Sequence, residues 1–331
     1  FLLTEDELRH VLSDSGAVAV VTTPEFLPKV LAVAGGLPVV VVGGEGRPGT
    51  TRFAELEAGE PLPVVDRQPE DLAALLYTGG TTGRSKGVAL THAGLDTAGA
   101  AAYAVSSRDR PTTGLLPLPL AHVYGLMVSV SALHARHAGP SVLMRWFDPA
   151  GFVALVEQHR VQQAALVPSM IQMLLTQPLE ERDLSCLERI SSGGAPLAVE
   201  VAHELERRIP SVEVREGYGC TETSALISAQ PSDERRLGSV GKPVPGVAVR
   251  ITSPEGTEVA AGEDGEICVR GPVLMTGYWN APEATAQAVR DGWLHTGDVG
   301  RVDADGWLYV VDRLKDLIIR NGFNVYPRDV E

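Results

Sequence analysis

The chain has little cysteine: only three occur among its 331 residues, at Cys186, Cys220 and Cys268. An odd number of widely separated cysteines excludes a disulfide framework and is typical of reduced thiols in the cytoplasm. The spacing also lacks the paired ligands of a structural zinc site. We therefore expect a cytoplasmic protein whose fold depends on neither disulfides nor such a zinc site.

Long apolar runs and dense basic clusters are also missing. No stretch of about 18 apolar residues occurs and no signal peptide is recognisable, so neither a membrane span nor secretion is expected. The formal net charge is -14, with 28 basic against 42 acidic residues, and the basic residues form no dense patch. General binding to nucleic acid or to anionic membranes is therefore not expected, and a phosphate ligand would need donors gathered locally.

The chain does have the composition of a globular protein. Hydrophobic residues make up 44% of it, which is enough for a substantial core in one large or two ordinary domains. Its 35 glycines and 23 prolines are scattered between apolar runs. This scatter is typical of loops in an α/β protein and fits neither a collagenous repeat nor a disordered segment.

The first two thirds of the chain alternate between strand and helix patterns. Thr4 and Glu7 form a capping box ahead of a helix, and apolar runs at 17–21 and 38–42 flank a helical stretch at 26–33. Short apolar runs of this kind predict buried parallel strands. Later segments that continue the pattern are the strands at 72–77, 164–167 and 212–216 and the amphipathic helix at 197–209.

After about residue 237 the pattern changes to successive strands. Runs at 247–251 and 266–270 and two halves of 299–311 read as strands, and 304–306 supplies a hairpin turn. These patterns predict an α/β part over 1–236, with parallel sheets flanked by helices, and a β-rich subdomain over 237–312. The remaining segment, 313–331, is too short for a domain, and we expect it to belong to something larger.

The most distinctive segment is 75–87, which reads LLYTGGTTGRSKG and follows a predicted strand. Glycines let backbone N–H groups approach oxygen anions, the hydroxyls of Thr78, Thr81 and Thr82 add donors, and Lys86 adds a mobile positive charge. The spacing does not match a Walker P-loop. The alternative is an ordinary surface loop, but strand, glycines, hydroxyls and lysine coincide here, so the segment predicts a polyphosphate site.

This segment resembles the phosphate loop of the adenylate-forming (ANL) superfamily, which contains acyl-CoA synthetases, luciferases and peptide-synthetase adenylation domains. Gly79 stands where serine is frequent and Ser85 where proline is frequent, and neither change removes a charge. The resemblance implies the large N-terminal domain of an acyl-CoA synthetase-like fold, incomplete at its start, with the β-rich part forming a distorted barrel. Four further segments match in the expected order: 193–196, 216–223, 293–298 and 309–316.

The resemblance also implies a nucleotide site. The ring of Tyr218 would stack on adenine, the hydroxyl of Thr221 would meet the α-phosphate, and Asp298 and Arg313 would bind the ribose hydroxyls. On its own, the 193–196 segment reads as a plain helix start with Pro196 in the first turn. The implied nucleotide-binding residues are Thr78, Gly79, Gly80, Thr81, Thr82, Gly83, Lys86, Gly194, Ala195, Pro196, Glu216, Gly217, Tyr218, Thr221, Asp298, Val310 and Arg313.

Catalytic roles are implied for Thr81, Lys86, Glu222 and His122, with Thr81 and Glu222 as the ligands of Mg²⁺. His122 would guard the carboxylate pocket, which Gly217 and Gly219 would also line; a satisfied core histidine is an equally weighted alternative. Lys315 occupies the family's hinge position, although the sequence alone favours an ordinary exposed lysine. Met275 and Trp279 are assigned to packing.

The implied reaction is ATP-dependent activation of a carboxylic acid to acyl-AMP with release of pyrophosphate, followed by transfer to CoA. ATP, Mg²⁺ and CoA are the implied cofactors, and apolar residues at 126–133 and 169–175 favour a hydrophobic acid, fatty or aryl. The 115–126 stretch contains no acidic residue to hold an amino group, which disfavours amino-acid activation. Two alternative functions stay open: a fatty acyl-AMP ligase or adenylation domain that loads a carrier protein, and a non-catalytic nucleotide-binding fragment. Whether the protein forms a homodimer is also left open. The family's C-terminal lysine lies beyond Glu331, so we expect weak adenylation by this chain.

Overall fold

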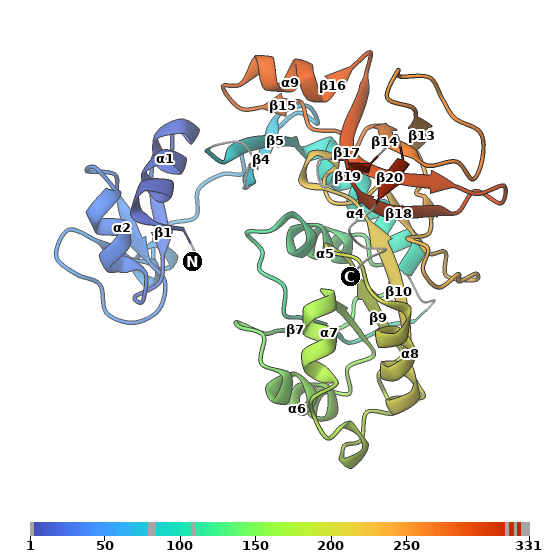
Figure 1. The fold of residues 1–331 in the computed structure, drawn as a ribbon. Helices are drawn as coiled ribbons and strands as arrows, with labels where there is room; N and C mark the ends of the chain where they lie inside the picture. Colours follow the sequence, from blue (N-terminus) through green and yellow to red (C-terminus); the bar gives the residue numbers. More distant parts are fainter. Residues whose placement is uncertain (1–2, 79–83, 107–109, 315–317, 321–322, 326–331) are drawn as a thin grey trace.

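The computed structural model describes residues 3–78, 84–106, 110–314, 318–320 and 323–325 (Figure 1). Within these residues, the chain begins with a small α/β unit, continues into a large mixed sheet, and ends in an antiparallel β-rich part. This architecture confirms the predicted class, an α/β fold with parallel sheets flanked by helices and a separate β-rich subdomain.

The N-terminal unit has a three-stranded parallel sheet in the order β1-β2-β3. Thr4 caps its first helix as the sequence predicts: its backbone N–H donates to the Glu7 carboxylate at 2.7 Å, and its hydroxyl accepts from the Glu7 N–H at 3.3 Å. The elements of this unit are α1 (Glu5–Ser15), β1 (Val20–Thr22), α2 (Leu27–Val33), β2 (Val39–Val41), β3 (Thr51–Arg52) and α3 (Phe53–Glu57).

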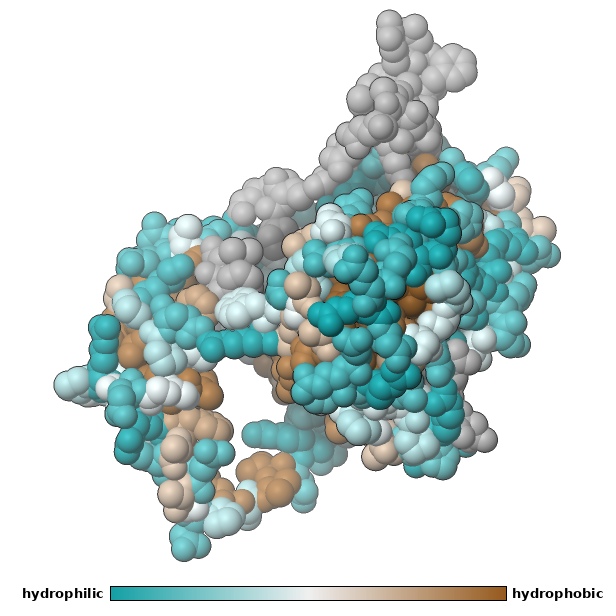
Figure 2. Space-filling model, turned by 90° about the horizontal axis from the view of Figure 1, so that it is seen from below, coloured by the Kyte–Doolittle hydropathy of each residue, from teal (hydrophilic) through white to brown (hydrophobic). Residues whose placement is uncertain are grey.

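The end of α1 is fastened to the rest of the protein at Asp14. The Tyr77 hydroxyl donates to the Asp14 carboxylate at 2.5 Å, and the Trp279 indole N–H donates to the Asp14 carbonyl at 2.9 Å. The unit also contacts residues 145 and 146, where Arg145 pairs with Glu25 and the Trp146 ring lies 6.4 Å from that of Phe26. Figure 2 shows an opening beside the unit, bordered by apolar and polar surface. The unit is therefore held close to the strand that precedes the predicted phosphate loop.

The central sheet has seven strands in the order β12-β11-β10-β9-β8-β6-β7. The five strands from β10 to β7 are parallel, which confirms the buried parallel strands predicted at 164–167 and 212–216, while β11 and β12 are antiparallel. The strands are β6 (Gly114–Leu116), β7 (Ser141–Leu143), β8 (Gln163–Leu166), β9 (Arg189–Ser192), β10 (Glu213–Tyr218), β11 (Ser228–Ala229) and β12 (Lys242–Pro243).

Helices cover both faces of this sheet. On one face, α6 (Pro149–His159), α7 (Pro168–Leu174) and α8 (Val199–Arg208) pack on buried strand residues such as Leu166 and Ile190. On the other face, α5 (Val123–Leu133), backed by α4 (His92–Ser106), packs on Leu116 and Ala165. Because α8 begins only at Val199, after an Ala198 cap, the expectation that Pro196 lies in the first helical turn is wrong.

A second, antiparallel group corrects one prediction. The run at 72–77 forms β4 (Leu72–Thr78), but it pairs antiparallel with β5 (Lys86–Thr91) and not in a parallel sheet. The reason is the short 79–85 connection, because only antiparallel neighbours can be joined without a long crossover. The third strand, β15 (Gly277–Tyr278), adds to the free edge of β5.

The last part is an antiparallel sheet in the order β13-β14-β17-β16, with β18 also paired to β17. Register shifts in β14 and β17 let it curve into a half barrel. The predicted turn at 304–306 is present, with Gly306 at φ +84°. The elements are β13 (Ala248–Thr252), β14 (Gly265–Arg270), α9 (Pro282–Ala288), β16 (Val289–Arg290), β17 (Trp293–Val302) and β18 (Leu308–Arg313), followed by the hairpin of β19 (Ile318–Arg320) and β20 (Phe323–Val325).

Candidate functional site

The predicted nucleotide segments converge where the carboxyl ends of the parallel strands meet the β-rich part. A cavity of about 950 Å³ lies there, between the central sheet, α5 and the strands β17 and β18. The sequence-predicted residues that line it are Thr78, His122, Gly194, Ala195, Pro196, Glu216, Gly217, Tyr218, Gly219, Thr221, Glu222, Asp298, Val310 and Arg313. Segments separated by more than 200 positions in the sequence thus share one wall.

Some predicted residues lie outside the described part of the chain: Gly79, Gly80, Thr81, Thr82, Gly83 and Lys315. The base of the phosphate loop is nevertheless fixed, because Thr78 and Lys86 are paired residues at the ends of β4 and β5. Thr78 lines the cavity, and Lys86 has its Nζ 5.0 Å from the centroid of the Tyr278 ring. Strand pairing therefore holds the two ends of the predicted loop together.

Asp298 is oriented by two neighbouring side chains. The Tyr218 hydroxyl donates to its Oδ2 at 2.6 Å, and the Arg313 Nε lies 3.7 Å from its Oδ1. Burial raises the pKa of Asp298 above its ordinary value, while the Tyr218 hydrogen bond and the Arg313 charge oppose that rise. A partly desolvated carboxylate of this kind is a strong acceptor for vicinal hydroxyls.

Glu222 lies on the short 3₁₀ turn η2 (Thr221–Thr223), directly after β10. The Tyr278 hydroxyl donates to Glu222 Oε1 at 2.8 Å, and the Met275 backbone N–H donates to the Glu222 carbonyl at 2.8 Å. A carboxylate and a neighbouring hydroxyl, that of Thr221, therefore face the cavity together. Oxygen donors of this type suit Mg²⁺, which binds proteins through one or two carboxylates together with phosphate oxygens.

Close packing requires a glycine at position 219, which also lies in the cavity wall. A Cβ atom at this position would lie 2.0 Å from the Ala225 carbonyl oxygen, closer than any real contact. The chain doubles back at this point, and Ser224 and Ala225 both adopt positive φ angles, of 51° and 84°. Only glycine lets the turn that carries Glu222 pack this closely.

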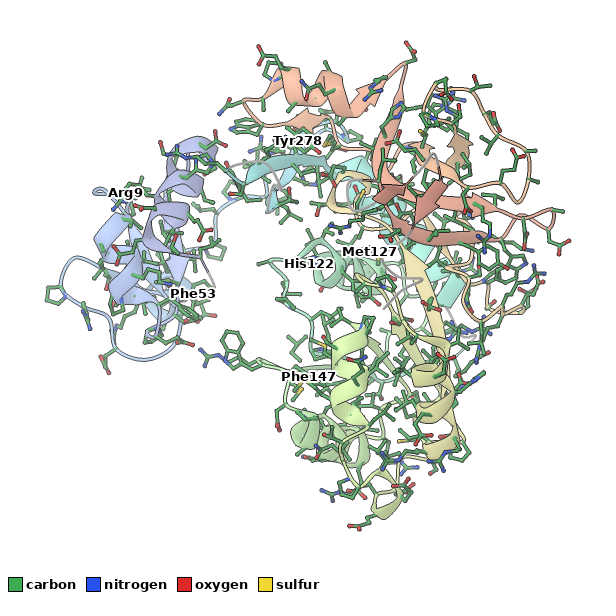
Figure 3. The ribbon with its side chains drawn as sticks, viewed as in Figure 1. Arg9, Phe53, His122, Met127, Phe147 and Tyr278 are labelled. Atoms are coloured by element: carbon green, nitrogen blue, oxygen red, sulfur yellow. The ribbon has the colours of Figure 1, made fainter. Side chains whose placement is uncertain are left out.

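His122 lies in the cavity wall and not in the core. It is the N-cap of α5, where its Nδ1 accepts a hydrogen bond from the Tyr124 backbone N–H at 3.2 Å, so the ring proton belongs on Nε2. Partial burial lowers the pKa of His122, which keeps the ring neutral at physiological pH. Figure 3 shows His122 at the start of α5 and Met127 within this helix.

The cavity continues between α5 and the sheet as an acyl-sized space. Met127, Val128 and Leu226 give it an apolar middle. The lining also contains a polar pair, in which the Gln163 side-chain amide donates to the Thr112 hydroxyl at 2.9 Å. Of the two apolar stretches proposed for the substrate, 126–133 contributes to the lining, whereas 169–175 packs in the core on the opposite face of the sheet.

Sequence reasoning missed two tyrosines of the site. Tyr124 lines the cavity two residues after His122 and donates its hydroxyl to the Ser191 carbonyl at 2.9 Å. Tyr278 holds Glu222, although the surrounding residues were assigned to packing. Neither partner is near in sequence, so no local pattern reveals these contacts. The tyrosines themselves were the one available signal.

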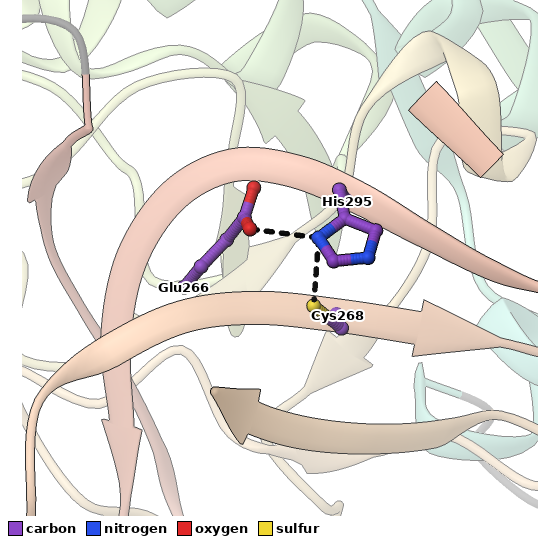
Figure 4. Close-up of side chains that lie close together, drawn as sticks. All are labelled: Glu266, Cys268 and His295. Carbon is purple, nitrogen blue, oxygen red and sulfur yellow. Dashed lines mark hydrogen bonds and ion pairs between the residues drawn. The ribbon is translucent and has the colours of Figure 1, made fainter. Parts of the chain in front are cut away.

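Beside Asp298, three potential metal ligands lie within 4.8 Å of one another: Glu266, Cys268 and His295 (Figure 4). The Glu266 oxygen is 2.7 Å from His295 Nδ1, and the Cys268 sulfur is 3.4 Å from the same atom. Two ligands of one tetrahedral zinc ion would be about 3.3 Å apart or more, so 2.7 Å fits a direct hydrogen bond. Glu266 also accepts from the Gly297 N–H at 3.2 Å, and the group therefore supports the part of β17 that carries Asp298.

Comparisons with known proteins agree with this geometry. The family model described as AMP-binding enzyme matches residues 1–279. A feruloyl-CoA synthase of Amycolatopsis sp is 39% identical over all of this chain and 66% of its own length, and a 4-coumarate--CoA ligase of Oryza sativa subsp. japonica is 38% identical over all of this chain and 64% of its own. The chain thus spans about two thirds of the length of these relatives.

Solved structures give the same result. ATP-bound MatB from Rhodopseudomonas palustris superposes with a TM-score of 0.88 at 36% identity, covering all of this chain and 66% of that one. The anthranilate CoA ligase AuaEII in complex with anthranoyl-AMP gives 0.92 at 25% identity, covering 100% and 65%. Among the residues that the structure describes, none of the helices has the length and apolarity to cross a membrane. This chain belongs to the AMP-binding (ANL) superfamily of adenylate-forming enzymes.

Proposed function

We propose that this chain carries the ATP and acyl sites of a cytoplasmic acid–CoA ligase, with ATP, Mg²⁺ and CoA as cofactors. The acid we assign is an aryl acid with a polar group at the end distant from its carboxylate. The names of the relatives support this class, since feruloyl-CoA synthase and 4-coumarate--CoA ligase match over all of the chain. The three free thiols support the compartment.

One observation carries the proposal: the nucleotide-binding and acyl-binding residues open into one continuous cavity. Asp298, Glu222 and Tyr218 lie in one part of its lining, His122 lies at the start of α5, and Met127 and Val128 continue it between helix and sheet. A carboxylate bound near His122 would therefore face the triphosphate. This is the arrangement that in-line attack on the α-phosphorus requires.

In the adenylation step, a carboxylate oxygen forms a bond to the α-phosphorus while the bond to the bridging oxygen breaks and pyrophosphate leaves. The chain's task is to stabilise charge on the phosphate oxygens, for which we assign the loop at 78–86 with Lys86 and the hydroxyl of Thr221. The neutral ring of His122 is assigned to hold the attacking carboxylate by its Nε2–H. Mg²⁺, when bound by Glu222 and Thr81, would neutralise phosphate charge.

Transfer to the thiol follows: the sulfur bonds to the acyl carbon, the bond to the AMP oxygen breaks, and AMP leaves. The polar pair of Gln163 and Thr112 in the cavity lining favours the aryl class over a fatty acid. A saturated tail there would bury the Gln163 and Thr112 polar groups without a new hydrogen-bond partner, which is costly. A ring hydroxyl can add a partner to this pair.

A substrate panel tests the proposal. Ferulate, 4-coumarate, benzoate and a medium-chain fatty acid are supplied with ATP and Mg²⁺, and pyrophosphate release and acyl-CoA formation are measured. We expect the hydroxylated aryl acids to give the highest kcat/KM, with CoA as acceptor. A preference for the fatty acid would overturn the aryl assignment, and transfer to a phosphopantetheinyl carrier with none to CoA would indicate a carrier-loading ligase. ATP binding with no turnover of any acid would favour the non-catalytic alternative.

A further inference from the structure

Tyr278 connects the two elements that flank the phosphate site. Its hydroxyl donates to Glu222 Oε1 at 2.8 Å, and its ring lies beneath Lys86, whose Nζ is 5.0 Å from the ring centroid. Glu222 lies in η2, which follows β10 of the central sheet, whereas Lys86 is the first residue of β5, after the predicted phosphate loop. One side chain therefore contacts both the carboxylate assigned to the metal and the cation assigned to the phosphates.

The backbone around Tyr278 is fixed on both sides. In β15, Tyr278 pairs with Val88 of β5, and the next residue donates its N–H to the Gly87 carbonyl at 2.7 Å. Met275 reaches in the other direction and donates its N–H to the Glu222 carbonyl at 2.8 Å. The Tyr278 N–H is itself held by the Thr285 hydroxyl at 2.8 Å. The ring has little freedom to leave its position between the two elements.

This placement has an electrostatic consequence. Lys86 and Glu222 carry opposite charges and both contact Tyr278. A direct ion pair would neutralise each with the other. No such pair joins these two described residues, and the phenol occupies the place between them. The ring face attracts the ammonium while the hydroxyl holds the carboxylate, so both charges are oriented without being neutralised.

Resting on the proposed function, we propose that Tyr278 is a positioning residue for the magnesium–triphosphate complex: its hydroxyl orients Glu222 toward the metal, and its ring keeps Lys86 away from that carboxylate. Partners that orient a metal-binding carboxylate typically alter metal affinity by about 10- to 100-fold when they are removed. The two contacts come from different parts of the side chain, so they can be removed separately.

Calorimetric titration with ATP, in the presence of Mg²⁺ and in the presence of a chelator, separates these contacts. Tyr278→Phe keeps the ring beneath Lys86 and removes only the hydroxyl. We expect it to weaken Mg·ATP binding roughly 10- to 100-fold, while metal-free ATP and AMP bind as to the unchanged protein. Tyr278→Leu also removes the ring and should weaken metal-free ATP binding too. In a Glu222→Ala background, Tyr278→Phe should have no further effect.

The matched control is Tyr309→Phe on β18. The Tyr309 hydroxyl donates to the Asp303 carboxylate at 3.2 Å, and the substitution removes that hydroxyl. It should leave both titrations unchanged. The inference fails if Tyr278→Phe binds Mg·ATP like the unchanged protein, or if it loses metal-free ATP and AMP binding to the same degree, which is the mark of a general structural role. Failure of the proposed function looks different: the unchanged protein would then bind no ATP in either titration.

Discussion

The Tyr218 hydroxyl donates a 2.6 Å hydrogen bond to Asp298, and this bond joins the end of the central parallel sheet to the half barrel. The two residues are separated by 80 positions in the sequence. The bond orients Asp298, the carboxylate that we assign to the ribose hydroxyls. The affinity for AMP should therefore depend on the Tyr218 hydroxyl as well as on its ring.

Removing that hydroxyl is the first test. Tyr218→Phe keeps the aromatic ring assigned to adenine but leaves Asp298 without its donor. We expect AMP to bind more weakly by about 1 to 2 kcal/mol, or roughly 5- to 30-fold. Isothermal titration measures the change, with Tyr309→Phe as the control. Equal affinities in Tyr218→Phe and the unchanged protein would show that orientation of Asp298 contributes nothing.

The pH dependence of AMP binding follows from Asp298. Burial raises its pKa above the ordinary value, and ribose binding needs the charged form. Affinity should therefore fall as the pH drops through this raised pKa, and it should begin to fall at a higher pH than an exposed aspartate would allow. In Asp298→Asn the affinity should be low and flat over the same range. A profile that is equally flat in the unchanged protein would contradict the role of Asp298.

The stability of the fold should depend on the charge of Asp298 in the opposite way to AMP affinity. The charged form favours AMP binding, whereas the protonated form favours the folded state. A carboxyl group whose pKa is raised by folding stabilises the fold below that pKa, and this stability is lost as the pH rises above it. At neutral pH the free protein therefore keeps a desolvated carboxylate at a cost. Asp298→Asn should accordingly keep or raise Tm without ligand while it weakens AMP binding. A fall in both would assign Asp298 to the structure alone.

Much of this site follows from short motifs, and the remainder from contacts that motifs do not encode. The segment at 193–196 follows β9, and the segment at 216–223 begins within β10. These two strands lie side by side in a parallel sheet, so strand patterns alone bring the segments together. The direction of β4 follows from the short loop that joins it to β5, which the apolar pattern of β4 does not reveal. The start of α8 is not marked by a capping side chain, because its N-cap residue is Ala198. Tyr124 and Tyr278 escaped notice because their partners, Ser191 and Glu222, are distant in sequence.

Lys86→Met tests the phosphate loop. The substitution keeps a long side chain over the Tyr278 ring and removes the charge. With charged hydrogen bonds worth about 1.5 to 3 kcal/mol, ATP affinity should fall roughly 10- to 150-fold. AMP lacks the β- and γ-phosphates, so its affinity should change little and serves as the internal control. If ATP and AMP weaken together, Lys86 acts through the fold and not through the triphosphate.

The Glu266 group should support the part of β17 that carries Asp298 and should not need a metal ion. In Glu266→Ala, His295 Nδ1 and the Gly297 N–H lose their acceptor, so we expect weaker AMP binding and a lower Tm. Zinc and a chelator should both leave the Tm of the unchanged protein as it is. A rise in Tm with zinc that Cys268→Ser abolishes would overturn this interpretation.

Alanine substitutions at Gly219 and Gly306 distinguish the cost of losing close packing from the cost of an unfavourable backbone conformation. An alanine Cβ at position 219 would meet the Ala225 carbonyl oxygen at 2.0 Å, so the turn that carries Glu222 must move. Position 306 has φ +84° and no atom within 4 Å of such a Cβ, so only the left-handed backbone opposes the change. Gly306→Ala should cost about 1 to 2 kcal/mol of unfolding free energy. Gly219→Ala should cost more than about 2 kcal/mol and also weaken Mg·ATP binding. Urea denaturation with calorimetry measures both; a smaller loss at 219 than at 306 would mean that this turn is free to relax.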